Sequence, residues 1–98
     1  MRVIGLKIID DFCRIQARAC SPAGHWIANV RNAEWKSLAD IRKTFRTCDR
    51  VGTCYVFNIG GNKYRLIAKI NFKSSIVVVK DLLLHKDYDS DKWKTGCE

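Results

Sequence analysis

The chain has 98 residues, 47% of them hydrophobic and 29% charged, with 18 lysines and arginines against 10 aspartates and glutamates. This length predicts one domain, residues 1–98, and the composition excludes a disordered chain. No apolar run approaches the roughly 20 residues that a membrane-spanning helix needs, and the N-terminus lacks a signal-peptide pattern, so we expect a soluble, cytoplasmic protein that contacts no membrane.

The chain opens with a predicted strand and a predicted helix. Residues 1–4, MRVI, are mostly apolar and suit a short opening strand. Residues 5–19 then repeat apolar side chains at spacings of four and three, which places Ile8, Phe12 and Ile15 on one helical face.

Two further helices are predicted before residue 50. Ser21 followed by Pro22 predicts a helix start, with a serine cap and a proline in the first helical position. Ser37 begins the pattern S-L-A-D, in which Asp40 stands three residues after the cap, as in a capping box. The side chains expected to face the core from these helices are Trp26, Val30, Ala33, Leu38, Ile41 and Phe45.

After residue 50 the apolar residues repeat with a period of two, which predicts strands. Residues 53–59, 63–72 and 76–84 form three such runs, and Gly60-Gly61-Asn62 and Lys73-Ser74-Ser75 supply the turns. The expected fold class is α+β, with a short N-terminal strand and two to three helices packed on a C-terminal antiparallel meander. The last ten residues are expected to form a short frayed helix or tail.

Basic residues cluster in the middle of the chain. Between residues 42 and 73 there are eight basic residues and one acid, so +7 of the net +8 charge belongs to this segment. In residues 63–72 basic side chains alternate with apolar ones, and we expect them on the solvent-facing side of the sheet. Such a cationic face favours a polyanion as partner, with nucleic acid first and an acidic protein second.

The five cysteines stand at positions 13, 20, 48, 54 and 97, without a C-x-x-C pair or a spacing typical of a zinc site. Because we expect a reducing compartment, we predict that most of them are small core residues and that no disulfide framework forms. We expect no metal and no other cofactor.

The last predicted strand ends in the sequence HKDYD. In the predicted hairpin Arg65 lies across from residues 83–85, so Arg65 and His85 approach each other if their side chains share a face. Simple alternation puts His85 on the face of Val79, and Lys80 on the other face.

These residue types suit the cleavage of RNA by attack of a ribose 2′-hydroxyl on the adjacent phosphate. The reaction needs groups that move protons and positive charge that stabilises the phosphorane. A histidine suits proton transfer, an arginine holds phosphate oxygens with two donors, and a tyrosine stacks on a base or holds the hydroxyl. The structural alternative is that HKDYD is only the polar end of a strand.

Residues 55–70, YVFNIGGNKYRLIAKI, followed by IVVVK and HKDYD, resemble the HigB toxins of bacterial type II toxin–antitoxin systems, in the RelE-like superfamily of messenger-RNA endoribonucleases. The resemblance extends to WKSLADIRKTF, residues 35–45, and to the tryptophan after the Ser-Pro pair. It implies helices packed on an antiparallel sheet. It also implies a metal-independent ribonuclease that acts on mRNA, often on translating ribosomes, and a HigA-like helix-turn-helix antitoxin that keeps it inactive.

The resemblance also carries expectations for single residues. The residues that match its N-K-Y-R and H-x-x-Y-D motifs are Asn62, Lys63, Arg65, His85 and Tyr88. The sequence departs from the family at Lys80, where relatives have arginine, and at Leu83-Leu84, where they have Gly-Thr. The expected catalytic residues are Arg65, His85, Tyr88 and Lys80. The residues expected to bind RNA are Asn62, Lys63, Lys69, Lys73, Arg42, Lys43, Arg46 and Arg50.

Two other functions stay open at this point. A non-catalytic module that binds RNA or the ribosome would keep the basic face without the proton-transfer geometry. Alternatively, the basic face could serve as the docking site of the antitoxin, because an acidic protein and RNA are attracted by the same charge.

Overall fold

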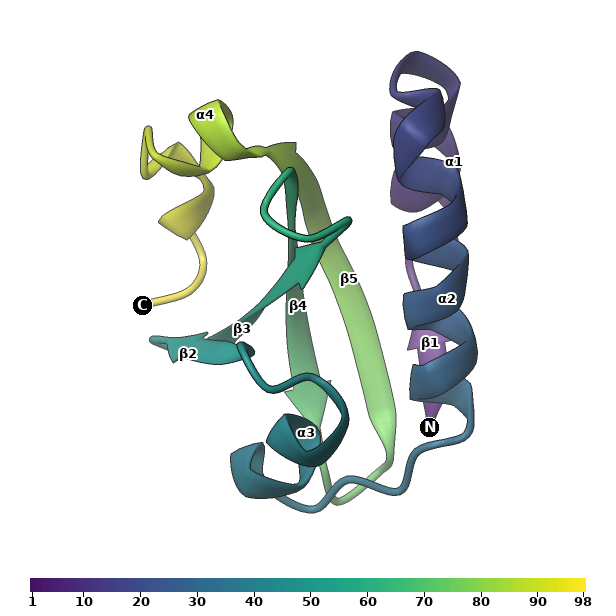
Figure 1. Ribbon diagram of the computed structural model, residues 1–98. Helices are drawn as coiled ribbons and strands as arrows, with labels where there is room; N and C mark the ends of the chain where they lie inside the picture. Colours follow the sequence, from purple (N-terminus) through teal and green to yellow (C-terminus); the bar gives the residue numbers. More distant parts are fainter.

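The computed structural model describes residues 1–98 and gathers all strands into one five-stranded sheet of order β1-β5-β4-β3-β2 (Figure 1). The strands are β1 (Arg2–Ile4), β2 (Asp49–Val51), β3 (Cys54–Ile59), β4 (Tyr64–Asn71) and β5 (Ile76–Leu84). The helices are α1 (Leu6–Ile15), α2 (Cys20–Arg31), α3 (Leu38–Thr44) and α4 (His85–Tyr88), with 3-10 turns at Ala17–Ala19 and Lys92–Lys94. The predicted α+β class is confirmed, and none of the helices is long and apolar enough to cross a bilayer.

The predicted meander is confirmed as β3, β4 and β5, which pair in antiparallel order. The sheet is wider than the meander, because β1 pairs in parallel with β5 and β2 pairs with β3. The sequence did not predict β2, since its three residues, Asp-Arg-Val, show no clear alternation. Helices α1 and α2 run along one face of the sheet, and α3 lies beside the end where β4 turns into β5 (Figure 1).

The main core lies between the helices and the sheet. Trp26 of α2 meets Phe57 of β3 edge-on, with ring centroids 5.3 Å apart. Trp35 and Phe45 flank α3 and also pack on Phe57, at 6.2 and 5.4 Å. The predicted core positions Trp26, Val30 and Ile41 are buried, because apolar side chains at helical spacing share the face that meets the sheet.

Two details of the helix predictions are wrong. Ile15 is 81% exposed, because α1 ends at this residue and Ile9 is the buried side chain of the helix. Ser21 is not a cap, because α2 begins at Cys20, directly after a 3-10 turn whose Ala17 carbonyl accepts the Cys20 N–H. The Ser37 cap of α3 is confirmed, since its hydroxyl accepts the Asp40 N–H at 3.3 Å.

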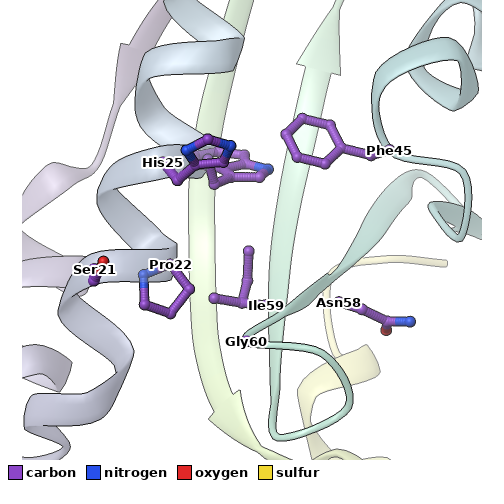
Figure 2. Close-up of a pocket in the computed structure, with 8 residues that line it drawn as sticks. Ser21, Pro22, His25, Phe45, Asn58, Ile59 and Gly60 are labelled. Carbon is purple, nitrogen blue, oxygen red and sulfur yellow. The ribbon is translucent and has the colours of Figure 1, made fainter.

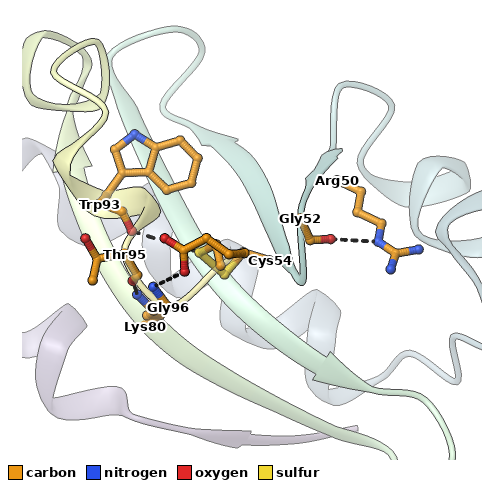
Figure 3. The surroundings of a disulfide bond; sticks show 9 residues. Arg50, Gly52, Cys54, Lys80, Trp93, Thr95 and Gly96 are labelled. Carbon is orange, nitrogen blue, oxygen red and sulfur yellow. Dashed lines mark hydrogen bonds between the residues drawn. A yellow bond between two sulfur atoms is a disulfide. The ribbon is translucent and has the colours of Figure 1, made fainter.

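The second face of the sheet is covered by residues 89–98, here called the C-terminal segment. Trp93 and Cys97 pack against Val56 and Ile67 in a smaller core on this face. Cys97 forms a disulfide with Cys54 of β3, with the two Cα atoms 5.2 Å apart (Figure 3). The prediction of an open cationic face is therefore wrong over the middle of β4, and so is the prediction that no disulfide forms.

The turn between β2 and β3 is shaped to receive the C-terminal segment. Gly52 has a φ of +61°, and a Cβ atom at this position would lie 1.7 Å from the carbonyl oxygen of Cys97, so only glycine fits. The same carbonyl accepts the N–H of Thr53 at 2.6 Å. The C-terminal segment is also held from β5, where Nζ of Lys80 donates to the carbonyl of Thr95 (Figure 3).

Candidate active site

A bulge in β5 decides which side chains meet near the end of the sheet. Ile67 of β4 lies opposite Asp81, but the next residue, Ala68, lies opposite Val79, which leaves Lys80 without a partner. The extra residue inverts the alternation of β5, so that Val79 and Leu82 both face the main core. The predicted grouping of His85 with Val79 by simple alternation is therefore wrong. The predicted register is confirmed, since Arg65 lies opposite Leu83.

Arg65 is the one charged side chain among the buried residues, with 8% of it exposed. Its Nη1 donates to the carbonyls of Asn62 and Tyr64, each at 3.2 Å, and its Nη2 donates to Oδ1 of Asn62 at 3.4 Å. The guanidinium carbon lies 5.4 Å from the ring centre of Tyr88, a cation–π distance. None of the ion pairs in the chain includes Arg65. Arg65 is thus a buried cation with spare N–H donors and no counter-ion.

The short helix α4 adds a histidine and a tyrosine beside Arg65. The backbone N–H of His85 donates to the carbonyl of Lys63 at 3.2 Å, which fixes the start of α4 against the end of β4. His85 Nδ1 lies 3.2 Å from Oδ2 of Asp89, and half of the imidazole side chain is exposed. A carboxylate on Nδ1 orients the ring and leaves Nε2 free for proton transfer. The spacing of three and four residues places His85, Tyr88 and Asp89 on one side of the helix.

The structure brings most of the predicted catalytic residues together, with one exception. Arg65 touches Tyr88 and Asn62, and the backbones of His85 and Lys63 are hydrogen-bonded to each other, all at the end of the sheet where α4 lies. Lys80 is not part of this group. Its side chain points away from the main core, as alternation from Val79 predicts, and donates to a backbone carbonyl of the C-terminal segment. Lys80 therefore contacts this segment, and its catalytic role stays a prediction.

The predicted RNA-binding residues fall into two regions instead of one face. Asn62 and Lys63 lie with Arg65, whereas α3 and the turn after β4 lie at the opposite end of the sheet from α4 (Figure 1). Three basic residues in the second region are engaged locally. Arg42 pairs with Asp49 at 3.5 Å, Lys43 pairs with Asp40 at 3.5 Å, and Arg50 donates to the carbonyl of Gly52 at 3.0 Å. The other three basic residues of this region, Arg46, Lys69 and Lys73, are exposed and form no ion pair.

Two hollows lie along the outer edge of β3, beyond the part that pairs with β2. The first, of about 340 Å³, lies between α2, Phe45 and the end of β3, and His25, Pro22 and Ile59 are on its walls (Figure 2). The second, of about 400 Å³, is lined by Thr47, Asn58, Gly61 and Asn62 and shares Asn58 with the first. Because Asn62 also binds the guanidinium of Arg65, the second hollow borders the Arg65 group.

Sequence reasoning missed three residues of this region. Asp89 was present in HKDYD but was not given the role of a partner for His85. Trp93 and Cys97 fall in the predicted frayed tail. The signal against a tail is that tryptophan and cysteine are usually buried in folded proteins, even when the residues around them are polar. Neither the pairing of Cys97 with Cys54 nor the stacking of Trp93 on Tyr88 could be read from spacing.

Comparison with known proteins adds the family. Residues 20–91 match the model of the HigB toxin family, described as the RelE-like toxic component of a toxin–antitoxin system. The chain belongs to the HigB toxin family. The match contains the Arg65 group and all of α4, and the predicted RelE-like architecture is confirmed with it. Trp93 and Cys97 lie outside the matched range.

Three similar curated proteins are named for an activity. The chain is similar to the mRNA interferase toxin HigB of Escherichia coli (strain K12) and to the mRNA interferase HigB of Escherichia coli O157:H7 and of Shigella flexneri. Each of these proteins is 43% identical over 35 residues, which is 36% of this HigB family chain and 34% of the relative. The matched part spans about a third of the length of the relatives.

Proposed function

We propose that this member of the HigB family is an endoribonuclease that cleaves messenger RNA on the translating ribosome, without a metal ion. We propose further that it is the toxin of a type II toxin–antitoxin system and that a HigA-like helix-turn-helix antitoxin neutralises it. The observation that carries the nuclease proposal is Arg65, a buried guanidinium without a carboxylate partner. A buried cation of this kind is stabilised when an anion such as a phosphate completes its surroundings.

The proposed chemistry assigns one task to each side chain. Arg65 and Lys63 stabilise the negative charge that develops when the 2′-hydroxyl attacks the phosphorus. His85, held by Asp89 at 3.2 Å, is the proton-transfer group. Tyr88 orients the nucleotide beside Arg65, and Asn62 holds the guanidinium from the hollow through which RNA would approach.

The test is a cleavage assay on messenger RNA, free and on translating ribosomes, with EDTA present. Arg65→Ala removes charge stabilisation, and we expect a loss of about 10²- to 10³-fold in rate. His85→Ala removes proton transfer, and we expect a loss of about 10²- to 10⁴-fold. Matched controls are Arg14→Ala and His25→Ala, both on exposed helix positions away from α4, which should cleave like the wild type.

The same assay separates the alternatives. Cleavage of free RNA at the same rate would remove the ribosome from the proposal. A wild type that binds RNA or ribosomes but cleaves neither with nor without EDTA would be a non-catalytic binding module, and the nuclease proposal would fail. The antitoxin is tested separately, by asking whether a co-expressed helix-turn-helix protein copurifies with the chain and suppresses cleavage.

A further inference from the structure

We propose that Trp93 is a positioning residue, which holds Tyr88 and through it the guanidinium of Arg65 in the geometry needed for RNA cleavage. Trp93 lies beyond residues 20–91, the range that matches the family. The inference rests on the proposed function for its kinetic readout, and its structural readout is independent of that function.

Two contacts of Trp93 fix both ends of Tyr88. The two rings stack with their centroids 4.9 Å apart and an angle of 14° between their planes. The indole Nε1 also donates to the backbone carbonyl of Tyr88 at 2.8 Å. The ring of Tyr88 then lies against Arg65, with 5.4 Å between the guanidinium carbon and the ring centre. Trp93, Tyr88 and Arg65 therefore form a continuous stack. If Trp93 moves, Tyr88 loses its support and no longer holds Arg65 in place.

Trp93 is itself held by the second core and by the disulfide. It is 6% exposed and packs with Val56, Ile67 and Cys97 on the sheet face opposite the helices. The C-terminal segment pairs with no strand of the sheet, so its position depends on these side-chain contacts and on a few backbone hydrogen bonds. The bond between Cys97 and Cys54 joins this segment covalently to β3 (Figure 3).

The position of a guanidinium matters because it must meet the phosphorane in a fixed geometry. A displacement of about 1 Å at a reacting centre can cost roughly 100-fold in rate. Loss of the stack should therefore lower kcat, while phosphate contacts made by exposed lysines continue to set KM. A residue that only stabilised the fold would instead lower the amount of folded protein and leave the kcat of that fraction unchanged.

Trp93→Leu and Trp93→Phe form a matched pair for the test. Leucine keeps an apolar side chain in the second core but removes the aromatic stack, whereas phenylalanine keeps the stack and loses the hydrogen bond from Nε1. We expect kcat for mRNA cleavage to fall about 10- to 100-fold in Trp93→Leu with KM within about twofold. Trp93→Phe should recover most of this loss. Thr95→Ala, in the same segment with an exposed side chain that makes no hydrogen bond, is the control and should match the wild type.

A second measurement does not require cleavage. The side-chain protons of Arg65 lie against the Tyr88 ring, so their NMR resonances should be displaced by the ring current in the free protein. In Trp93→Leu we expect these resonances to return toward those of an exposed arginine, and in Trp93→Phe and Thr95→Ala to stay displaced. Unchanged Arg65 resonances in folded Trp93→Leu would overturn the inference.

Two kinetic outcomes would also decide against it. Faster cleavage by Trp93→Leu would make the C-terminal segment a cover over Arg65, and equal kcat values for the leucine and phenylalanine variants would remove the stack from the mechanism. If the wild type cleaves no RNA, the proposed nuclease fails, and the NMR comparison still decides whether Trp93 positions Arg65.

Discussion

Arg65 illustrates how a single residue can be costly to the fold and valuable to the site. Moving a cation out of water costs several kcal/mol, and an ion pair is the usual compensation. Here the compensation comes from three hydrogen bonds to oxygens of Asn62 and Tyr64 and from the Tyr88 ring. These are neutral partners, so the charge itself stays unbalanced. A phosphate would find a cation that is already desolvated and held in place.

Asp81 allows a residue-scale prediction about pH. Burial is the main cause that raises the pKa of this carboxyl, against the hydrogen bond from the Leu82 N–H and the charge of Lys80. The folded protein therefore binds the Asp81 proton more strongly than the unfolded chain does, so the charged carboxylate destabilises the fold. This penalty is complete above the raised pKa and disappears as the pH falls below the unfolded value of 3.8.

We therefore expect Asp81→Asn to raise the free energy of unfolding at pH 7 by at most about 0.5 kcal/mol, because the carboxyl is partly exposed and solvent screens its charge. The side-chain carbonyl of asparagine can still accept the Leu82 N–H, so this bond survives the substitution. Urea unfolding at pH 7 and at pH 4 measures the effect, and the gain should shrink at the lower pH. Asp10→Asn, an exposed position on α1, is the control. An equal gain at both pH values would contradict the explanation.

At the scale of elements, the meander and the helices could be predicted, whereas the bulge in β5 could not. Glycines at 60 and 61 and the alternation of β4 identify strand, turn and strand. The sequence of β5 is apolar on both faces, so nothing in IVVVKDLLL shows where the alternation inverts. Pairing with β4 decides it, because leaving Lys80 without a partner puts Leu82 in the main core, where simple alternation would have put Asp81.

The disulfide leads to a prediction for the C-terminal segment. It closes a loop over a sequence separation of 43 residues, for which chain entropy gives a stabilisation of roughly 2–4 kcal/mol. Reduction with dithiothreitol should lower the free energy of unfolding by this amount. Urea unfolding with and without the reductant measures it, and Cys20→Ser, which removes an exposed free thiol, should respond like the wild type.

A thiol count checks the pairing itself. Unfolded without reductant, the chain should offer three reactive thiols, Cys13, Cys20 and Cys48, and after reduction five. The count must be made in denaturant, because burial raises the pKa of Cys48 to about 12 in the folded protein and keeps its thiol unreactive. Five reactive thiols before reduction would show that the bond does not form.

At the scale of the whole molecule, the basic residues predicted to act on RNA separate into a group beside α4 and a group at the other end of the sheet. The sequence identified Asn62, Lys63, Arg65, His85 and Tyr88 by their motif, and the structure places them together beside α4. The predicted hairpin also separates Lys69 and Lys73, near its turn, from Arg65. The sequence could not show that α3, which Arg46 follows, lies beside that turn (Figure 1). The net charge is the same wherever the basic residues lie, and the path of the chain through the sheet decides which of them come together.

This separation predicts different effects for the two ends. Lys69 and Lys73 are exposed near the turn between β4 and β5, without ion pairs, and suit contacts with phosphates. We expect the double variant Lys69→Glu and Lys73→Glu to weaken RNA binding and to leave the kcat of cleavage unchanged. If each lysine contacts one phosphate of a single strand, the slope of log K against log salt should fall by about 1.4.

The measurement is RNA affinity over a series of salt concentrations, together with kcat at saturating RNA. Lys7→Glu and Arg14→Glu on α1 change the net charge equally at exposed positions away from this end, and serve as the control. If both double variants lower the slope alike, the binding follows net charge alone. If Lys69→Glu and Lys73→Glu lower kcat instead, the two ends are not separate, and RNA must lie across the C-terminal segment from one to the other.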